Sequence, residues 1–172
     1  MLAVKDGKLT SNPVSGLKFF PESTRTRFLS GDELKRLQGV MSKSDWKLVA
    51  FAIETGLRRE EQFRLRWDQV DLEHGILTLP LPKGGKTRHV PLSEEAKAIL
   101  RSFDSFLRSA WVFPGLIDVT QPMDSRAFLR RAFERGLRQA GITGVCWHTL
   151  RHTAASRRVA AGGDLVSVKE IL

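Results

Sequence analysis

The sequence predicts an α+β fold that is mainly helical and includes a small three-stranded antiparallel β-sheet. Apolar residues recur at helical spacing along most of the 172 residues, and β-rich segments separated by turn residues occur only between residues 67 and 92. No periodic repeat is present. A chain of this length with 41% hydrophobic residues can bury the core of one domain.

The chain up to residue 65 is predicted to form three helices after an entry segment. Residues 1–20 contain proline and glycine breaks and are expected to precede the domain. The Ser-Gly-Asp-Glu sequence at 30–33 is a capping box, which predicts the start of the first helix. A second helix is expected from about residue 45 to Gly56, because glycine readily adopts the conformation that ends a helix. A short third helix is expected over residues 59–65.

The segment between residues 67 and 92 is predicted to form the sheet. Residues 67–71 are expected to be the first strand, 76–79 the second and 87–90 the third. The Lys-Gly-Gly-Lys sequence at 83–86 is typical of a hairpin turn between the last two. Three prolines flank these segments, so we expect short strands or strands at a sheet edge.

The second half of the chain is predicted to be helical around one loop. A helix capped by Ser93 is expected to continue to residue 107, and residues 111–123, which contain Pro, Gly and Asp, are expected to be loop. A long amphipathic helix is then expected over residues 124–141, and another over 148–161. The inward face of the long helix is predicted to consist of Ala127, Phe128, Ala132, Phe133 and Leu137.

The chain is strongly basic. Its 28 Lys+Arg against 19 Asp+Glu give a net charge of +9 and a pI near 10.3. This charge is expected to attract nucleic acid first and an acidic membrane surface second, although a solubilising surface excess would also explain it. Cys146 is the only cysteine, so we expect no disulfide framework and a reducing, cytoplasmic setting. No apolar run approaches the roughly 18 residues of a membrane span.

The first motif that indicates chemistry is Thr-Gly-Leu-Arg-Arg-Glu-Glu at residues 55–61. Arg58 follows the glycine that is expected to end a helix, and its planar, permanently charged guanidinium is suited to pairing with phosphate oxygens. The alternative is a surface arginine that pairs with Glu61, three residues later. Both interpretations fit this motif when it is taken alone.

The second motif is His-Thr-Leu-Arg-His at residues 148–152. At a helix start, which favours anions, His148 can exchange a proton near neutral pH and Arg151 can bind an oxygen beside it. His148 and His152 have the spacing of zinc ligands, but Thr149 stands where such a motif needs glutamate, so no metal site is predicted. A buried structural histidine is the other alternative.

The predicted hairpin turn carries Lys83. A cationic hairpin can enter a DNA groove and deliver a proton, although an ordinary solvated turn explains lysine and glycine here equally well. Lys86 and Arg88 are candidates for contacts with backbone phosphates, as are Arg126 and Arg130 on the polar face of a later helix.

Taken in order, these motifs resemble those of the tyrosine recombinase (phage integrase) family. They are Thr-Gly-Leu-Arg-x-x-Glu, a hairpin lysine followed by Arg-x-Val-Pro-Leu, and His-x-Leu-Arg-His-Thr, and the resemblance extends over about residues 12–172. It implies the helical catalytic domain of that family over residues 21–172. It also implies that residues 1–20 are the end of a core-binding domain and its linker.

The resemblance further implies roles for the motif residues. Arg58 and Arg151 would hold the scissile phosphate. His148 would assist proton transfer, and Lys83 would protonate the departing 5′ oxygen. A tyrosine of the family attacks the phosphate and forms a covalent 3′-phosphotyrosine, so that no metal or other cofactor is needed. Members act as homotetramers on double-stranded DNA. The residues that would support this site are Glu61 and His152.

The sequence departs from the family because it contains no tyrosine. The family would place another His or Trp, and then the nucleophile, shortly after Leu172. Residues 164–172 follow an apolar helical pattern to the end of the sequence, so we expect a catalytic domain that is truncated before its nucleophile, inactive and monomeric by itself. A non-catalytic DNA-binding module is the alternative function, and an unrelated basic helical protein is a third.

Overall fold

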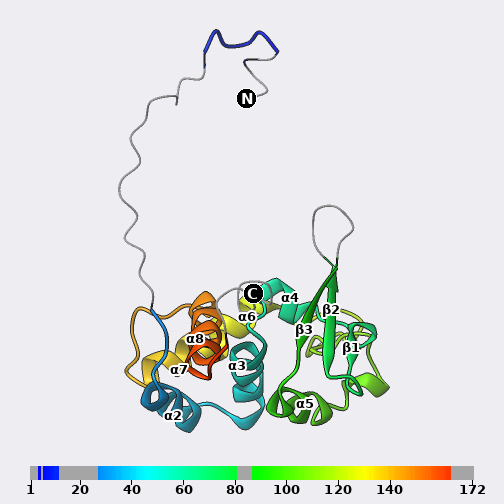
Figure 1. The fold of residues 1–172 in the computed structure, drawn as a ribbon, viewed down its shortest axis with the longest axis vertical. Coiled ribbons are helices and arrows are strands. Elements are labelled where there is room, and N and C mark those ends of the chain that lie inside the picture. Colours follow the sequence, from blue (N-terminus) through cyan, green and yellow to red (C-terminus); the bar gives the residue numbers. More distant parts are fainter. Residues whose placement is uncertain (1–3, 5, 12–26, 81–86, 164–172) are drawn as a thin grey trace.

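The computed structural model describes residue 4 and residues 6–11, 27–80 and 87–163 of the chain (Figure 1). The elements in chain order are α2 (Gly31–Val40), α3 (Lys43–Thr55), α4 (Arg59–Phe63), the 3₁₀ turn η1 (Trp67–Gln69), β1 (Val70–Asp71), β2 (Ile76–Pro80), β3 (Thr87–Pro91), α5 (Glu94–Arg101), the 3₁₀ turn η2 (Ser105–Leu107), α6 (Ser125–Phe128), the π-helical turn η3 (Leu129–Phe133), α7 (Glu134–Gln139) and α8 (Trp147–Ala160).

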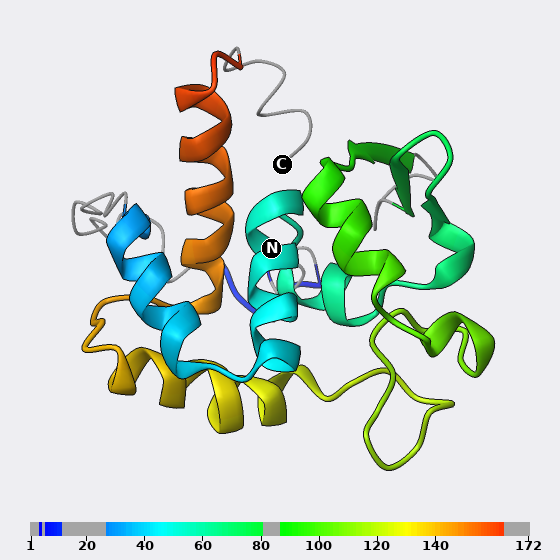
Figure 2. The same cartoon turned by 90° about the horizontal axis from the view of Figure 1, so that it is seen from below.

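Helix α3 lies between the two halves of the structure. It packs against α8 on one side and α5 on the other, while α2 packs against α7 (Figure 1, Figure 2). The antiparallel sheet has the order β1-β2-β3 and lies on the α5 side. The predicted fold class, mainly helical α+β with a three-stranded antiparallel sheet, is confirmed. Among the described elements, no helix has both the length and the apolar character to cross a membrane.

The starts of α2 and α3 follow from side-chain caps. In the predicted capping box, Ser30 Oγ accepts the Glu33 N–H at 3.2 Å, and the Glu33 carboxylate accepts the Ser30 N–H at 3.0 Å. Helix α3 begins at Lys43, two residues before the predicted start, because Ser42 Oγ accepts the Asp45 N–H at 3.1 Å. Gly56 ends α3 as predicted, with φ 68°.

The second and third strands form as predicted. Leu77 pairs with Val90, and both side chains are buried. The prediction of a strand over residues 67–71 was wrong for residues 67–69, which form η1. The Trp67 N–H donates to the Ala110 carbonyl at 3.0 Å, so this backbone donor is satisfied by a loop rather than by β2. The predicted turn at 83–86 lies outside the described residues.

Helix α5 is shorter than predicted. It ends at Arg101 rather than at residue 107, and η2 follows. Ser105 is the reason, because its buried hydroxyl donates to the Val112 carbonyl at 2.8 Å and accepts the Trp67 indole N–H at 3.2 Å. These contacts tie the chain to the loop that follows, in which Trp111 forms an isolated β-bridge with Arg66 and Pro114 forms one with Pro122.

The predicted helix over residues 124–141 begins at the Asp124 cap, but η3 interrupts it. A π-helical turn holds one residue more than an α-turn, so the apolar positions before and after it do not follow a single α-helical face. Phe128 and Phe133 are buried as predicted, whereas the prediction for Ala127 was wrong and this residue is exposed. Gly141 follows the end of α7 with φ 65°.

An aromatic cluster joins α4, α6, η3 and α8 in the core. The ring centroid of Phe63 lies 5.4 Å from that of Phe128 and 5.5 Å from that of Trp147, which in turn lies 5.1 Å from that of Phe133. Large buried rings contribute strongly to stability and leave little room for rearrangement. The cluster therefore fixes α4, through its last residue, relative to the start of α8, and the first turns of both helices carry candidate site residues.

Candidate anion-binding site

Arg58 and Glu61 form the local pair that was considered from the sequence. The Glu61 carboxylate accepts the Arg58 backbone N–H at 2.8 Å and the Arg58 Nη1 at 3.0 Å. The Arg58 side chain is nevertheless 56% exposed, against 23% for Glu61. Because local pairing leaves the outer part of the guanidinium open to solvent, it does not exclude the binding of an anion from outside.

Arg88 reaches the same carboxylate from β3. Its Nη2 donates to Glu61 Oε2 at 2.7 Å, and its side chain is 11% exposed. Partial burial tends to raise the pKa of Glu61, but the hydrogen bonds from Arg58 and the charges of Arg88 and Arg58 outweigh it and hold the pKa below its usual value. Glu61 is therefore ionised near neutral pH and links α4 to the sheet.

Arg151 approaches the cluster from the second turn of α8. Its Nη1 donates to the Gly56 carbonyl oxygen at 2.7 Å, and the side chain is partly buried. Burial and the positive charges of Arg58 and Arg88 lower the pKa of Arg151 to about 10, which outweighs the opposite effect of Glu61. In the described part of the chain no carboxylate forms an ion pair with Arg151. The cluster thus holds three guanidinium groups around one carboxylate.

His148 lies beside these cations at the N-terminal end of α8. Burial lowers its pKa below 6.5, and the charges of His152, Arg151 and Arg58 lower it further. Its ring packs edge-on against that of His152, with the centroids 4.7 Å apart. The imidazole is therefore largely neutral at pH 7 and can accept a proton. Neither histidine is a buried core residue, so the structural alternative for His148 was wrong.

A hollow of about 750 Å³ opens at this site. Arg58, Glu61 and His148 line its charged side. Its apolar part is formed by Leu57, Leu129 and Trp147. Helix α8 begins at Trp147 because the Thr149 hydroxyl accepts the Cys146 N–H at 3.1 Å. This start places His148 in the first turn of the helix, where the free backbone amides favour an anion.

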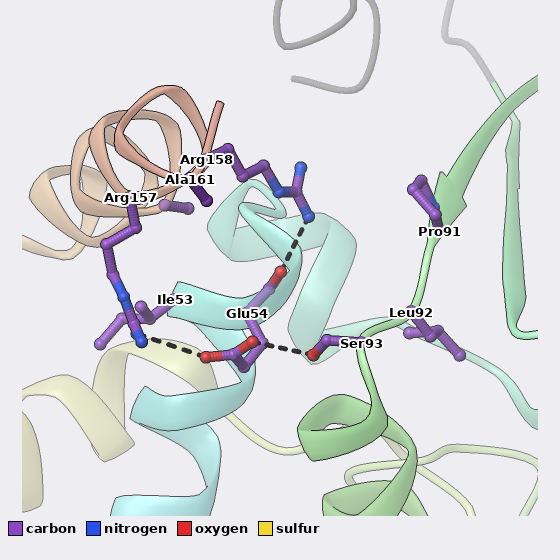
Figure 3. Close-up of a pocket in the computed structure, with 9 residues that line it drawn as sticks. Ile53, Glu54, Pro91, Leu92, Ser93, Arg157, Arg158 and Ala161 are labelled. Atoms are coloured by element: carbon purple, nitrogen blue, oxygen red, sulfur yellow. Dashed lines mark hydrogen bonds and ion pairs between the residues drawn. The ribbon is translucent and has the colours of Figure 1, made fainter. Parts of the chain in front are cut away.

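A second contact region fixes α8 against α3. The Glu54 carboxylate accepts the Ser93 hydroxyl at 2.8 Å and lies 3.3 Å from Arg157 Nη1 (Figure 3). Arg158 Nη2 donates to the Glu54 carbonyl oxygen at 2.8 Å. These contacts border a hollow of about 400 Å³ and join α3, α8 and the residue that caps α5. They hold the C-terminal part of α8 against α3, the helix that ends at Gly56.

The remaining predicted site residues are Lys83, Lys86, Arg126 and Arg130. Lys83 and Lys86 lie outside the described residues. Arg126 and Arg130 are exposed, on α6 and η3 respectively. Arg126 lines a separate polar hollow of about 620 Å³ together with Arg59 and Arg64.

Sequence reasoning missed several residues that build the site. The Gly56 carbonyl binds Arg151, and the side chain of Glu54 anchors α8. No signal in the sequence identifies a carbonyl acceptor 95 residues away in the chain. The basic pair Arg157-Arg158 can be recognised in the sequence, but charged residues on a helix more often face solvent than hold two helices together.

Most of the chain matches a known protein family. Residues 27–172 match the model of the phage integrase family. The chain belongs to this family. Its integrase relatives include the tyrosine recombinase XerC of Xanthomonas campestris pv. campestris (strain B100), which is 33% identical over 179 residues covering 98% of this chain and 54% of the relative. The integrase of Salmonella phage P22 is 30% identical over 162 residues, covering 88% of this chain and 41% of the phage protein.

Solved integrase and recombinase structures share the fold. The crystal structure of XerA recombinase superposes with a TM-score of 0.70 at 28% identity, over 85% of this chain and 55% of that one. A lambda integrase (75-356) dimer bound to a COC′ core site gives a TM-score of 0.74 at 19% identity, over 99% of this chain and 66% of that one. The chain spans about half the length of the curated integrase-family relatives it matches.

Proposed function

We propose that this chain supplies the phosphate-binding part of a site-specific DNA recombinase that breaks and rejoins double-stranded DNA. The main observation in support is that Arg151 is half-buried beside Arg58. Their like charges repel in a partly desolvated site, which contributes to the lowered pKa of Arg151, and an anion bound between them relieves this repulsion. A DNA phosphodiester carries one negative charge and two non-bridging oxygens that such groups can pair with.

Roles for the site residues follow from this proposal. Arg58 and Arg151 bind the scissile phosphate, and Glu61 orients Arg58. The tyrosine oxygen bonds to phosphorus as the bond to the 5′ oxygen breaks, and that oxygen takes a proton from Lys83. His148, neutral at pH 7, accepts the proton of the attacking hydroxyl. The 172 residues contain no tyrosine, so the nucleophile comes from outside them.

Solved family structures with bound DNA support DNA as the partner. A lambda integrase tetramer is bound to a Holliday junction, and the Tn1549 transposon integrase is in complex with a circular intermediate DNA. We extend this to the whole protein, which we propose to act as a homotetramer on DNA inside the cell. Residues 21–172 would be its catalytic domain and residues 1–20 the link to a core-binding domain.

Binding to a fluorescently labelled DNA duplex at several salt concentrations tests the proposal. Arg58→Ala and Arg151→Ala should each weaken binding by about 10- to 150-fold, because each removes a charge-assisted contact worth roughly 1.5–3 kcal/mol. Arg101→Ala on α5 is the matched control, since it removes an exposed arginine outside the cluster. Equal affinities for all three variants would defeat the proposal.

A nicked duplex tests the assignment of the nucleophile. If a tyrosine is the attacking group, these 172 residues should bind the duplex without forming a covalent bond to it, because they lack tyrosine. A covalent protein–DNA band on a denaturing gel would show that another side chain attacks the phosphate.

A further inference from the structure

Arg88 is much more buried than Arg58, and its guanidinium points toward Glu61. Its side chain is 11% exposed, whereas that of Arg58 is 56% exposed. Its Nη2 lies 2.7 Å from Glu61 Oε2. Arg88 is one of the candidates that the sequence suggests for backbone phosphate contacts, yet a guanidinium with so little exposed surface offers little to a DNA duplex.

Glu61 distributes its two oxygens between two arginines. Oε1 accepts Arg58 Nη1 at 3.0 Å, while Oε2 accepts both Arg88 Nη2 and the Arg58 backbone N–H. A carboxylate can instead turn both oxygens to one guanidinium and form a bidentate pair. The contact with Arg88 opposes this rotation, so Arg58 keeps a single side-chain bond to Glu61.

The charges lead to the same conclusion. Arg58, Arg88 and Arg151 surround Glu61, so the cluster has two positive charges in excess of its carboxylate. Without Arg88, Glu61 would neutralise Arg58 as a closed pair. The attraction between Arg58 and a phosphate would then fall, because the competing carboxylate lies on the same group.

We propose that Arg88 is a positioning residue, which acts through Glu61 to orient Arg58 and keep its charge available, and which does not itself contact DNA. The contact connects β3 to the start of α4 across 27 residues, so it also sets the sheet against the motif that carries Arg58. The inference rests on the proposed function for its consequence in DNA binding, but the orientation of Arg58 can be measured without DNA.

A double-mutant cycle in the duplex-binding assay tests the inference. Arg88→Met keeps the buried stem and removes the charge, and it should weaken binding by about tenfold. In a Glu61→Gln background, Arg88→Met should have little further effect, because the residue through which Arg88 acts is already changed. An equal loss in both backgrounds would indicate a direct phosphate contact and overturn the inference, as would no loss in either.

Rescue and an independent signal complete the test. Arg88→Lys retains a cation that can reach Glu61 and should restore most of the affinity. If Arg88→Met does not fold, as judged by thermal unfolding, Arg88→Gln, which also removes the charge, replaces it in the cycle with Glu61→Gln, and additive losses would contradict the inference. Without DNA, the ¹⁵N NMR signal of Arg58 Nε should shift in Arg88→Met and stay in place in Arg101→Ala. An unmoved Arg58 signal overturns the inference.

These measurements separate the two claims. If Arg58→Ala does not change duplex affinity, the proposed function fails, and the Arg58 signal still decides whether Arg88 positions it. If Arg58→Ala weakens binding while the cycle shows no coupling between Arg88 and Glu61, the proposed function stands and the inference fails.

Discussion

The guanidinium of Arg151 donates a 2.7 Å hydrogen bond to the carbonyl oxygen of Gly56, 95 residues earlier in the chain. Gly56 is the residue at which α3 ends, and its φ of 68° turns the carbonyl away from the helix direction and sends the chain toward Arg58. One helix terminus therefore positions both arginines of the proposed phosphate site, Arg58 through the chain and Arg151 through the carbonyl.

This relationship predicts two effects for Gly56→Ala. An alanine at this φ should cost about 1–2 kcal/mol of folding free energy, because a Cβ is unfavourable in the left-handed region. It should also weaken duplex binding, since relief of the strain moves the carbonyl that holds Arg151. Chemical denaturation and fluorescence anisotropy measure the two effects.

Gly141→Ala is the matched control for that substitution. Gly141 has φ 65° after α7, and a Cβ there would meet no atom within 4 Å, so only the backbone cost applies. Its stability should fall as much as that of Gly56→Ala while duplex affinity is retained. Loss of affinity in both variants would show that stability, rather than the Arg151 contact, governs binding.

The pKa of His148 is predicted to report on occupancy of the site. Burial and the charges of His152, Arg151 and Arg58 hold it below 6.5 in the free protein. A bound phosphate neutralises these charges, so binding should raise the pKa and take up a proton. Duplex affinity should therefore rise as pH is lowered from about 7.5 to about 5.5, and His148→Gln should flatten this dependence.

NMR titration of the His148 ring protons checks the electrostatic cause. Arg58→Ala should raise the pKa of His148 without DNA, because one of the charges that lower it is removed. Arg101→Ala should leave the titration unchanged. A His148 titration that does not move in Arg58→Ala would mean that the two groups are not electrostatically coupled.

Local signals in the sequence predicted much of the fold. The capping box at Ser30, the glycine at 56 and the pairing of β2 with β3 all depend on residues close in the chain, and all three are confirmed. The end of α5 could not be predicted in this way. It depends on Ser105, whose hydroxyl bonds to Trp67 and Val112, and such distant contacts have no local signature.

The candidate site, like the fold, could be predicted only in part from the sequence. The motifs identified Arg58, His148 and Arg151 as chemically suited to phosphate, and the structure brings them together. Nothing in the sequence indicates that the Arg88 side chain lies against Glu61 rather than toward DNA. Strand alternation predicts which face a residue occupies, but not which charge lies opposite it.

A contact near the N-terminus should make folding stability sensitive to acid. The two Arg27 guanidinium nitrogens donate to the Glu33 carboxylate at 2.9 and 2.5 Å, and with the Ser30 N–H they hold the pKa of Glu33 at about 2. A depressed carboxylate pKa stabilises the folded state above the unfolded value near 4.5, and this stability is lost as pH falls toward 2.

Glu33→Gln should remove that dependence. Its melting temperature should fall at pH 7 and approach that of the parent chain as both are acidified, because the amide does not titrate. Glu95→Gln, at an exposed position in the first turn of α5, is the control and should leave the parent profile intact. If the difference in melting temperature between Glu33→Gln and the parent chain were the same at all pH values, Glu33 would not be the source of the acid sensitivity.

The contacts of Glu54 predict that Glu54→Ala and Arg157→Ala lower the free energy of unfolding by different amounts. The hydrogen bond from Ser93 is partly buried, so Glu54→Ala should destabilise the protein by about 1–2 kcal/mol. Arg157 is 58% exposed and 3.3 Å from the carboxylate, so Arg157→Ala should cost less than about 1 kcal/mol.

Ser93 both donates to Glu54 and caps α5. Ser93→Ala should therefore cost less stability in the Glu54→Ala background than in the parent chain, because only the cap is then lost. Urea denaturation of the four variants measures these differences. If Arg157→Ala costs as much as Glu54→Ala, the ion pair with Arg157, rather than the hydrogen bond from Ser93, accounts for the contribution of Glu54 to stability.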